Sequence, residues 1–237
     1  VNKIPHLVYI TSDKCYLNFD NTSSFKERDV LGGLDNYSSS KASAEILFSS
    51  YFNSFFKKEK NLSLASVRAG NVIGGGDMKI NRIIPDIVKA FYNKKNIILR
   101  SPRSTRPWQH VLEPLSGYLL IGEKLLNKKL NNKILPSWNL GPETKNCKNV
   151  EFITKLFLKK LETKKSNIKI QVKNKKKFYE SKFLSLNINK AKKELHWKPR
   201  LNLNQTISFT ADWYKNYFEK KNMENFTEKQ INTFLEN

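Results

Sequence analysis

The chain has 237 residues, of which 39% are hydrophobic, so it can form one large domain or two smaller ones that share a core. Its 43 Lys and Arg against 21 Asp and Glu give a formal net charge of +22. The lysines are spread along the chain among Asn and Ile instead of being grouped with Arg and aromatic residues. This pattern favours a solvated basic surface over a specific nucleic-acid or membrane-binding surface.

The two cysteines, Cys15 and Cys147, are too few for a disulfide framework and are typical of reduced thiols in a cytoplasmic protein. No Cys/His cluster has the spacing of a metal site, and we expect no bound metal. The sequence also has no apolar run as long as a membrane span and no signal-peptide pattern.

Short apolar runs alternate with helical patterns along the chain. We predict strands at 6–11, 64–68, 96–100, 137–141 and 169–172, and helices at 36–58, 83–91, 111–126, 149–161, 189–195 and 203–219. The segments 17–36, 71–77 and 101–110 are predicted as loops, and the first strand as a buried one. The alternation favours an α/β fold with a parallel sheet.

Tyr37 and Lys41 lie four residues apart in the predicted helix 36–58, so their side chains share one face. A lysine ammonium beside a phenol stabilises the phenolate. Such a tyrosine can remove a proton from a substrate hydroxyl while hydride leaves the same carbon. The pair alone is weak evidence, because this spacing occurs by chance in many helices.

Ser12, Asp13 and Lys14 follow the first predicted strand, at the end where open α/β sheets bind ligands. A serine hydroxyl can complete the hydrogen-bond relay of the tyrosine, and a carboxylic acid at Asp13 can protonate a leaving hydroxyl. Lys14 can act as a base only if burial or neighbouring charge favours its neutral form. The alternative is an ordinary polar turn between a strand and a loop.

Together these residues resemble the extended short-chain dehydrogenase/reductase family, in which a strand ending in Ser or Thr precedes Tyr-x-x-x-Lys on the next helix. Within it, the chain is most similar to the CDP-glucose 4,6-dehydratases. The similarity rests on TSDKCY (11–16), LGGLDNYSSSK (31–41), SVRAGNVIGGGD (66–77), RIIPD (82–86), TRPWQHVLEPLSGYLL (105–120), WNLGP (138–142) and AKKELHWKP (191–199). Lys14 points to the CDP-sugar branch, because the dTDP-glucose and GDP-mannose dehydratases typically carry an acidic residue there.

The resemblance implies the C-terminal part of a Rossmann-like doubly wound parallel sheet plus a smaller α/β substrate-binding domain. Residues 1–76 would form the C-terminal half of the Rossmann-like domain, with the catalytic residues. Residues 77–237 would form mainly the substrate-binding domain, with 111–142 returning to the sheet. Family members commonly dimerise through the helix that carries the Tyr–Lys pair, which makes a homodimer an expected assembly.

The implied activity converts CDP-glucose to CDP-4-dehydro-6-deoxyglucose with transient oxidation by NAD, for deoxysugar and surface-polysaccharide synthesis. Tyr37 would take the proton of the sugar 4-hydroxyl, Lys41 would assist it and contact the nicotinamide ribose, and Ser12 would hydrogen-bond the reacting hydroxyl. Asp13 would protonate the departing C6 hydroxyl. Lys14 stands where relatives use a glutamate for C5 deprotonation, and it would serve either as that base or to place a water or a charge.

Four further residues are expected to bind substrate by the same resemblance. Arg106 matches an arginine near the diphosphate, although a surface arginine in a loop is the alternative, and its planar fork suits phosphate oxygens. Asn71 matches a substrate-contacting asparagine, while Arg82 and Glu180 lie in segments near the nucleotide. Tyr179 and Met78 replace the histidine and tryptophan usual in the family, which leaves the choice of nucleotide open.

Two other functional classes remain compatible with the sequence. One is another nucleotide-sugar dehydratase or epimerase of the same family, which product formation from UDP-, GDP- or dTDP-sugars would reveal. The other is a non-catalytic binder of sugar nucleotides or nucleic acid. A steeply salt-dependent affinity for DNA would favour a nucleic-acid binder.

No G-x-G-x-x-G turn for the dinucleotide pyrophosphate occurs in these 237 residues, and the first strand already ends in the catalytic serine. We therefore expect a chain shortened at its N-terminus that binds NAD weakly and has little activity alone. Titration calorimetry of the 237-residue chain with NAD⁺ tests this expectation, and a dissociation constant in the micromolar range would contradict it.

Overall fold

The computed structural model describes residues 6–20, 22–58, 64–130, 135–161, 167–173 and 181–237. The helices are α1 (Asn36–Tyr51), α2 (Ile83–Tyr92), α3 (Leu112–Leu126), α4 (Val150–Leu161), α5 (Leu203–Phe218) and α6 (Met223–Glu236). The strands are β1 (Leu7–Ile10), β2 (Leu64–Ala69), β3 (Val72–Ile73), β4 (Ile97–Leu99), β5 (Thr105–Arg106), β6 (Gln109–His110), β7 (Ser137–Leu140), β8 (Lys148–Asn149) and β9 (Ile170–Val172). Short helical turns are η1 (Asp13–Cys15), η2 (Phe52–Phe56), η3 (Thr144–Asn146) and η4 (Ala191–Leu195).

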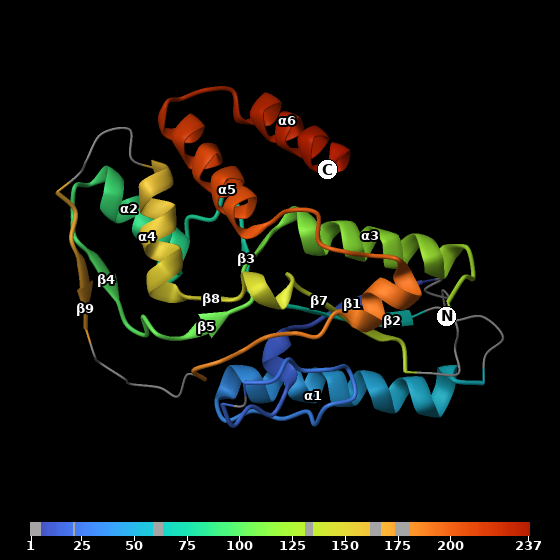
Figure 1. The fold of residues 1–237 in the computed structure, drawn as a ribbon. Coiled ribbons are helices and arrows are strands. Elements are labelled where there is room, and N and C mark those ends of the chain that lie inside the picture. Colours follow the sequence, from blue (N-terminus) through green and yellow to red (C-terminus); the bar gives the residue numbers. More distant parts are fainter. Residues whose placement is uncertain (1–5, 21, 59–63, 131–134, 162–166, 174–180) are drawn as a thin grey trace.

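The strands β1, β2 and β7 form a parallel sheet with β2 in the middle. Figure 1 shows α1 and α3 on opposite sides of this sheet, so every residue of β2 and β7 is buried. The prediction of a buried first strand is wrong, because Leu7 and Ile10 are 44% and 50% exposed. β1 has a pairing partner on one side only among the described strands.

A second cluster of buried apolar residues surrounds α2, α4 and α5. It includes Ile87, Phe157 and Ile207, and the strand pair β4–β9 lies beside it (Figure 1). The first cluster fills the space around the β1–β2–β7 sheet. The proposed division of the chain at residue 76 stays a prediction.

Two predicted loops contain short strands. β3 pairs in parallel with β6, and β5 pairs antiparallel with β8, each over only two residues. The expectation that 71–77 and 101–110 are loops throughout is therefore wrong. Pairings this short are set by distant chain segments, and two residues show no alternating pattern that could be seen in the sequence.

The C-terminal region also differs from the sequence prediction. After α5, the chain forms the additional helix α6, which packs against α5 and is capped at its start by Asn222. Trp213 of α5 donates a hydrogen bond to Thr227 of α6 over 3.0 Å. α6 buries few apolar side chains, and for that reason its sequence resembles a polar tail.

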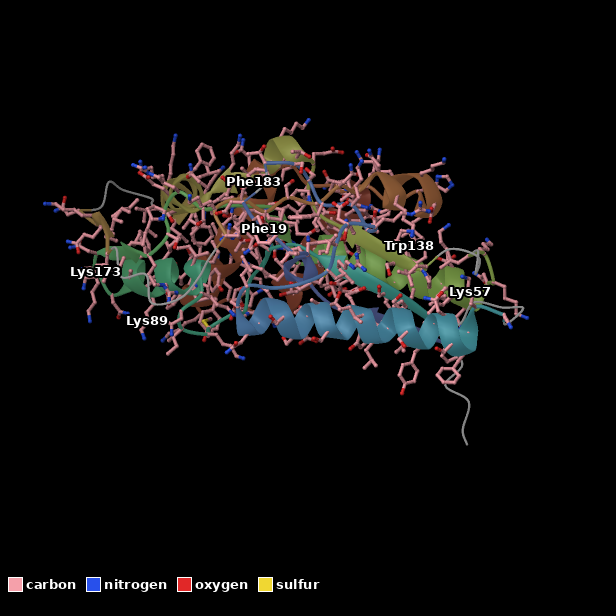
Figure 2. All side chains as sticks on the ribbon, turned by 90° about the horizontal axis from the view of Figure 1, so that it is seen from below. Phe19, Lys57, Lys89, Trp138, Lys173 and Phe183 are labelled. Atoms are coloured by element: carbon pink, nitrogen blue, oxygen red, sulfur yellow. The ribbon has the colours of Figure 1, made fainter. Side chains whose placement is uncertain are left out.

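The basic side chains are dispersed over the surface. Figure 2 shows exposed Lys57 at one end of the molecule and exposed Lys89 and Lys173 at the other. This distribution supports the interpretation of the +22 charge as a solvated surface. Within the described ranges, no helix combines the length and the apolarity needed to cross a membrane.

A buried ion pair connects α1 to the middle strand of the sheet. Arg68 of β2 contacts the Glu45 carboxylate over 2.7 Å, and both side chains are at most 1% exposed. Arg68 also donates to the Tyr16 hydroxyl over 2.9 Å, and Tyr16 donates to Asn139 of β7 over 2.6 Å. The pair is therefore part of a polar network that crosses the whole sheet.

We expect Arg68→Leu to lower the free energy of unfolding by about 3–5 kcal/mol, because the substitution leaves the Glu45 charge buried without its partner. Urea unfolding at neutral pH measures this loss. Lys155→Ala, which breaks the exposed pair with Glu151, is the matched control and should cost at most about 0.5 kcal/mol. Equal losses of unfolding free energy in Arg68→Leu and Lys155→Ala would contradict the role of the buried ion pair.

Candidate active site

The turn that follows β1 places Asp13 in the protein interior. Ser12 has an extended backbone and caps η1, and its hydroxyl accepts a hydrogen bond from the Lys14 amide over 3.2 Å. The same hydroxyl donates to Oδ1 of Asp13 over 3.1 Å. Because these bonds fix the short turn, the Asp13 side chain is held at 3% exposure.

Asp13 has the electrostatic properties of a proton donor. Burial raises its pKa from 3.8 to about 6, against the opposing effects of Lys14, the Ser12 hydrogen bond and Arg106. Its Oδ2 atom is buried and has no hydrogen-bond partner among the described residues. An acid whose pKa lies near the working pH can both hold a proton and release it. The unpaired oxygen is then available to a ligand hydroxyl.

Helix α1 begins beside this turn and carries the Tyr–Lys pair in its first two turns. Asp35 caps the helix by accepting from the Ser38 amide over 3.0 Å and from the Ser38 hydroxyl over 2.6 Å. Tyr37 is 55% exposed, and Nζ of Lys41 lies 5.7 Å from its ring centroid. The predicted common face of the two side chains is present, with Tyr37 exposed and Lys41 half-buried.

A small cavity lies between η1 and the start of α1. Its lining residues are Asp13, Lys14, Tyr16, Asn18, Gly33, Leu34, Asp35, Ser38, Ser181 and Leu184. The cavity volume of about 10 Å³ is space for a single water molecule. The strand end and the helix start thus meet at one site, with the Asp13 carboxyl in its wall.

Arg106 lies on the Asp13 side of the protein and is not a surface arginine. It is 3% exposed, and its guanidinium donates to the carbonyls of Thr105 over 2.8 Å and Ser181 over 2.7 Å. Its charge lowers the pKa of Asp13, which shows that the two groups are close enough to interact. The predicted contact of Arg106 with a diphosphate stays a prediction.

Of the other predicted substrate residues, Asn71 and Arg82 do not line the Asp13 cavity. Asn71 follows β2 at the carboxyl edge of the sheet, is half-buried, and accepts a hydrogen bond from the Gln109 amide at its backbone carbonyl over 3.0 Å. Arg82 is exposed at the start of α2 and pairs with Asp77 over 2.9 Å. Glu180 lies outside the described residues.

Sequence reasoning missed two residues that organise this site. Asp35 caps the helix start, and Glu45 accepts hydrogen bonds from Thr11 and from Ser66. An Asp three residues before a Ser at a helix start is a capping signal that could have been recognised. Glu45 gave no such signal, because a glutamate within an amphipathic helix is usually a surface residue.

The raised pKa of Asp13 predicts a stability change with pH. Because the folded state holds this proton more tightly than the unfolded state, Asp13 destabilises the protein as the pH rises from about 4 to about 6. Asp13→Asn should remove this loss, so that the variant is more stable than the original chain by about 2–3 kcal/mol at pH 7 and similar to it near pH 4. Urea unfolding across this pH range measures the free energy of unfolding of both proteins. The same difference in free energy between variant and original at pH 4 and at pH 7 would contradict the prediction.

Comparison with known proteins identifies relatives over almost the whole chain. Residues 2–210 match the protein family described as GDP-mannose 4,6 dehydratase. CDP-glucose 4,6-dehydratase of Salmonella typhimurium is 38% identical over 99% of this chain and 65% of its own length. The dTDP-D-glucose 4,6-dehydratase of Dictyostelium discoideum is 28% identical over 52% of this chain and 29% of its own length. The chain thus spans just under two thirds of the Salmonella protein.

Solved structures show the same fold. A dTDP-glucose 4,6-dehydratase from Bacillus anthracis in complex with NAD matches 91% of this chain and 63% of its own, with a TM-score of 0.72 and 23% identity. A UDP-glucuronic acid 4-epimerase from Bacillus cereus matches 89% and 61%, with a TM-score of 0.72 and 18% identity. The predicted Rossmann-like α/β fold class is confirmed. The family match over residues 2–210 means that this chain belongs to the GDP-mannose 4,6 dehydratase family.

Proposed function

We propose that this chain carries the reacting residues of a nucleotide-sugar 4,6-dehydratase that uses NAD, with CDP-glucose as its substrate. The observation that carries the proposal is a buried acid with an unpaired carboxyl oxygen, Asp13, beside the helix that carries the exposed Tyr37 and the neighbouring Lys41. The 38% identity to a CDP-glucose 4,6-dehydratase supports the choice of nucleotide, as does Lys14 at the strand end.

The first proton transfer takes place at the Tyr37–Lys41 face of α1. Tyr37 accepts the proton of the sugar 4-hydroxyl at its phenolic oxygen, and the Lys41 ammonium beside the ring stabilises the phenolate by its charge. Ser12 orients the same sugar hydroxyl from the strand end. Lys41 would also hold a ribose hydroxyl of NAD when the dinucleotide is bound. The sugar loses a proton from O4 and a hydride from C4 and becomes a 4-ketone. The ketone makes the proton on C5 more acidic.

The elimination of water needs an acid and a base on the other wall of the site. Asp13 donates its proton to the C6 hydroxyl as the C6–O bond breaks, and burial, which raises its pKa to about 6, increases the share of the protonated form over that of an ordinary Asp. Lys14 follows it directly and lies in the same cavity wall. Lys14 supplies either the base that removes the C5 proton or a charge that places a water molecule to accept that proton.

The residues of this chain can hold one part of NAD, the nicotinamide ribose. When bound, NAD accepts a hydride from C4 of the sugar and returns it to C6. The Tyr37–Lys41 face fits the nicotinamide ribose, because the exposed phenol and the half-buried lysine beside it both carry hydrogen-bond donors. The glycine-rich turn that usually holds the pyrophosphate is not among these 237 residues.

Substrate binding is assigned to Asn71, Arg82, Arg106 and Glu180. Arg106 brings a buried guanidinium toward the Asp13 side of the site, which suits the diphosphate, and Arg82 offers an exposed one. The expected homodimer would form through α1 and the turn η2 that follows it, which expose Ile46, Leu47, Tyr51 and Phe55 at 54–64% each. The product would serve deoxysugar and surface-polysaccharide synthesis in the cytoplasm.

The proposal predicts that Tyr37→Phe lowers kcat by about 10²- to 10⁴-fold and leaves the dissociation constant of CDP-glucose nearly unchanged, because only the phenolic oxygen moves the proton. The protein in its full coding length, supplied with NAD⁺, is assayed by mass spectrometry for the dehydrated sugar nucleotide. Tyr217→Phe is the control, since Tyr217 is another exposed tyrosine and lies in α5, outside the residues assigned to the site and to the dimer, and it should keep full activity.

Assays of the same protein with UDP-, GDP- and dTDP-glucose test the choice of nucleotide. Turnover of CDP-glucose, with none of UDP-, GDP- or dTDP-glucose, is the expected result. Turnover of another of these nucleotides and none of CDP-glucose would replace the substrate while keeping the reaction class. Lost CDP-glucose binding in Tyr37→Phe would mean that the tyrosine is structural.

A further inference from the structure

The Glu45 carboxylate joins the two elements that carry the reacting residues. Its Oε1 accepts a hydrogen bond from the Thr11 hydroxyl at the end of β1, and its Oε2 accepts from Ser66 over 3.0 Å. Arg68 contacts Oε2 over 2.7 Å. One fully buried side chain of α1 therefore contacts both β2 and the strand end that leads into the site.

Thr11 is fixed on two sides. Its backbone amide donates to the Val67 carbonyl over 2.9 Å, which extends the β1–β2 pairing by one residue. Its hydroxyl bonds to α1 through Glu45. Ser12 follows with no residue between, and Ser12 holds both the Lys14 amide and the Asp13 carboxyl. A displacement of Thr11 is transmitted directly to the turn that buries Asp13.

Glu45 lies one helical turn after Lys41 and two turns after Tyr37 on α1. A helix of this length moves as a rigid unit, so the position of Glu45 fixes the position of the Tyr37–Lys41 face. The Thr11 hydroxyl donates to one oxygen of the Glu45 carboxyl group, and Arg68 contacts the other oxygen. Glu45 is therefore held between the strand end and the middle strand of the sheet.

We propose that the Thr11–Glu45 hydrogen bond is a positioning contact that sets the separation between the Ser12–Asp13 turn and the Tyr37–Lys41 face. Thr11 and Glu45 are positioning residues, since neither lines the Asp13 cavity. The inference deepens the proposed function and rests on it for its kinetic consequence. The structural consequence, that Thr11 holds Asp13 in its buried position, does not need a substrate.

Thr11→Val is the informative substitution because it removes one hydroxyl and keeps the shape of the side chain. Glu45→Ala is less useful, since it leaves Arg68 buried without its partner and is expected to fold poorly. Ser66→Ala is the matched control: it also deletes one buried hydroxyl that donates to Glu45, but from the middle of β2. Thr11→Ser restores the hydroxyl and is the rescue variant.

The substrate-free measurement follows the Asp13 carboxyl carbon by NMR as the pH changes, with Asp13→Asn identifying the resonance. The charged groups facing Asp13 are Lys14 and Arg106, and all four proteins retain them. We expect a midpoint near 6 in the original chain, in Ser66→Ala and in Thr11→Ser. In Thr11→Val it should fall toward the ordinary Asp value of about 4, because the loosened turn exposes the carboxyl. An unchanged midpoint in Thr11→Val would overturn the proposal.

The kinetic measurement uses the full-length protein with CDP-glucose and NAD⁺. Thr11→Val should lower kcat by about 10- to 100-fold with KM within about twofold of the original, and Thr11→Ser should recover it. Equal losses of kcat in Thr11→Val and Ser66→Ala would mean that both hydroxyls only stabilise the fold, and would overturn the proposal. If the original protein turns over no nucleotide sugar, the proposed function fails, while the NMR titration still decides the positioning role.

Discussion

The buried ion pair between Arg68 and Glu45 is the contact on which the sheet, helix α1 and the site depend together. Taking two charges out of water costs several kcal/mol for each ion, which only close pairing and further hydrogen bonds can offset. The structure meets this demand by surrounding the pair with hydroxyl groups of Thr11, Ser66 and Tyr16. Because each hydroxyl comes from a different part of the chain, satisfying the charges also fixes the helix against the strands.

Asp13 illustrates the opposite use of burial. Its carboxyl is desolvated like that of Glu45, and one of its oxygens has no hydrogen-bond partner among the described residues. The consequence is a carboxyl whose pKa is raised by burial to about 6. A group held in this way lowers the stability of the fold near neutral pH and is suited to donate a proton, which is the usual compromise at an active site.

The sequence predicted the features that depend on short stretches of chain. The strand β2, helix α1 and the polar turn Ser12–Lys14 follow from apolar runs and from neighbouring residues, and the structure contains them. The two-residue strands and the buried position of Arg106 could not be predicted, because pairing partners distant in sequence determine them. The role of Glu45 was hidden for the same reason, since only the folded sheet brings Arg68 to it.

The contrast between features set by neighbouring residues and features set by distant ones explains why the proposed chemistry of the site is easier to recognise in the sequence than its specificity. All the proposed reacting residues lie within positions 12–41, where one strand end, one loop and one helix start are consecutive in the chain. The carbonyl of Ser181, which lines the cavity, accepts a hydrogen bond from the Arg106 guanidinium, so segments distant in the sequence meet beside the cavity. Under the proposed function, substitutions of these two residues would change what the site binds without altering the Tyr37–Lys41 motif, so the nucleotide must be established by direct comparison of substrates.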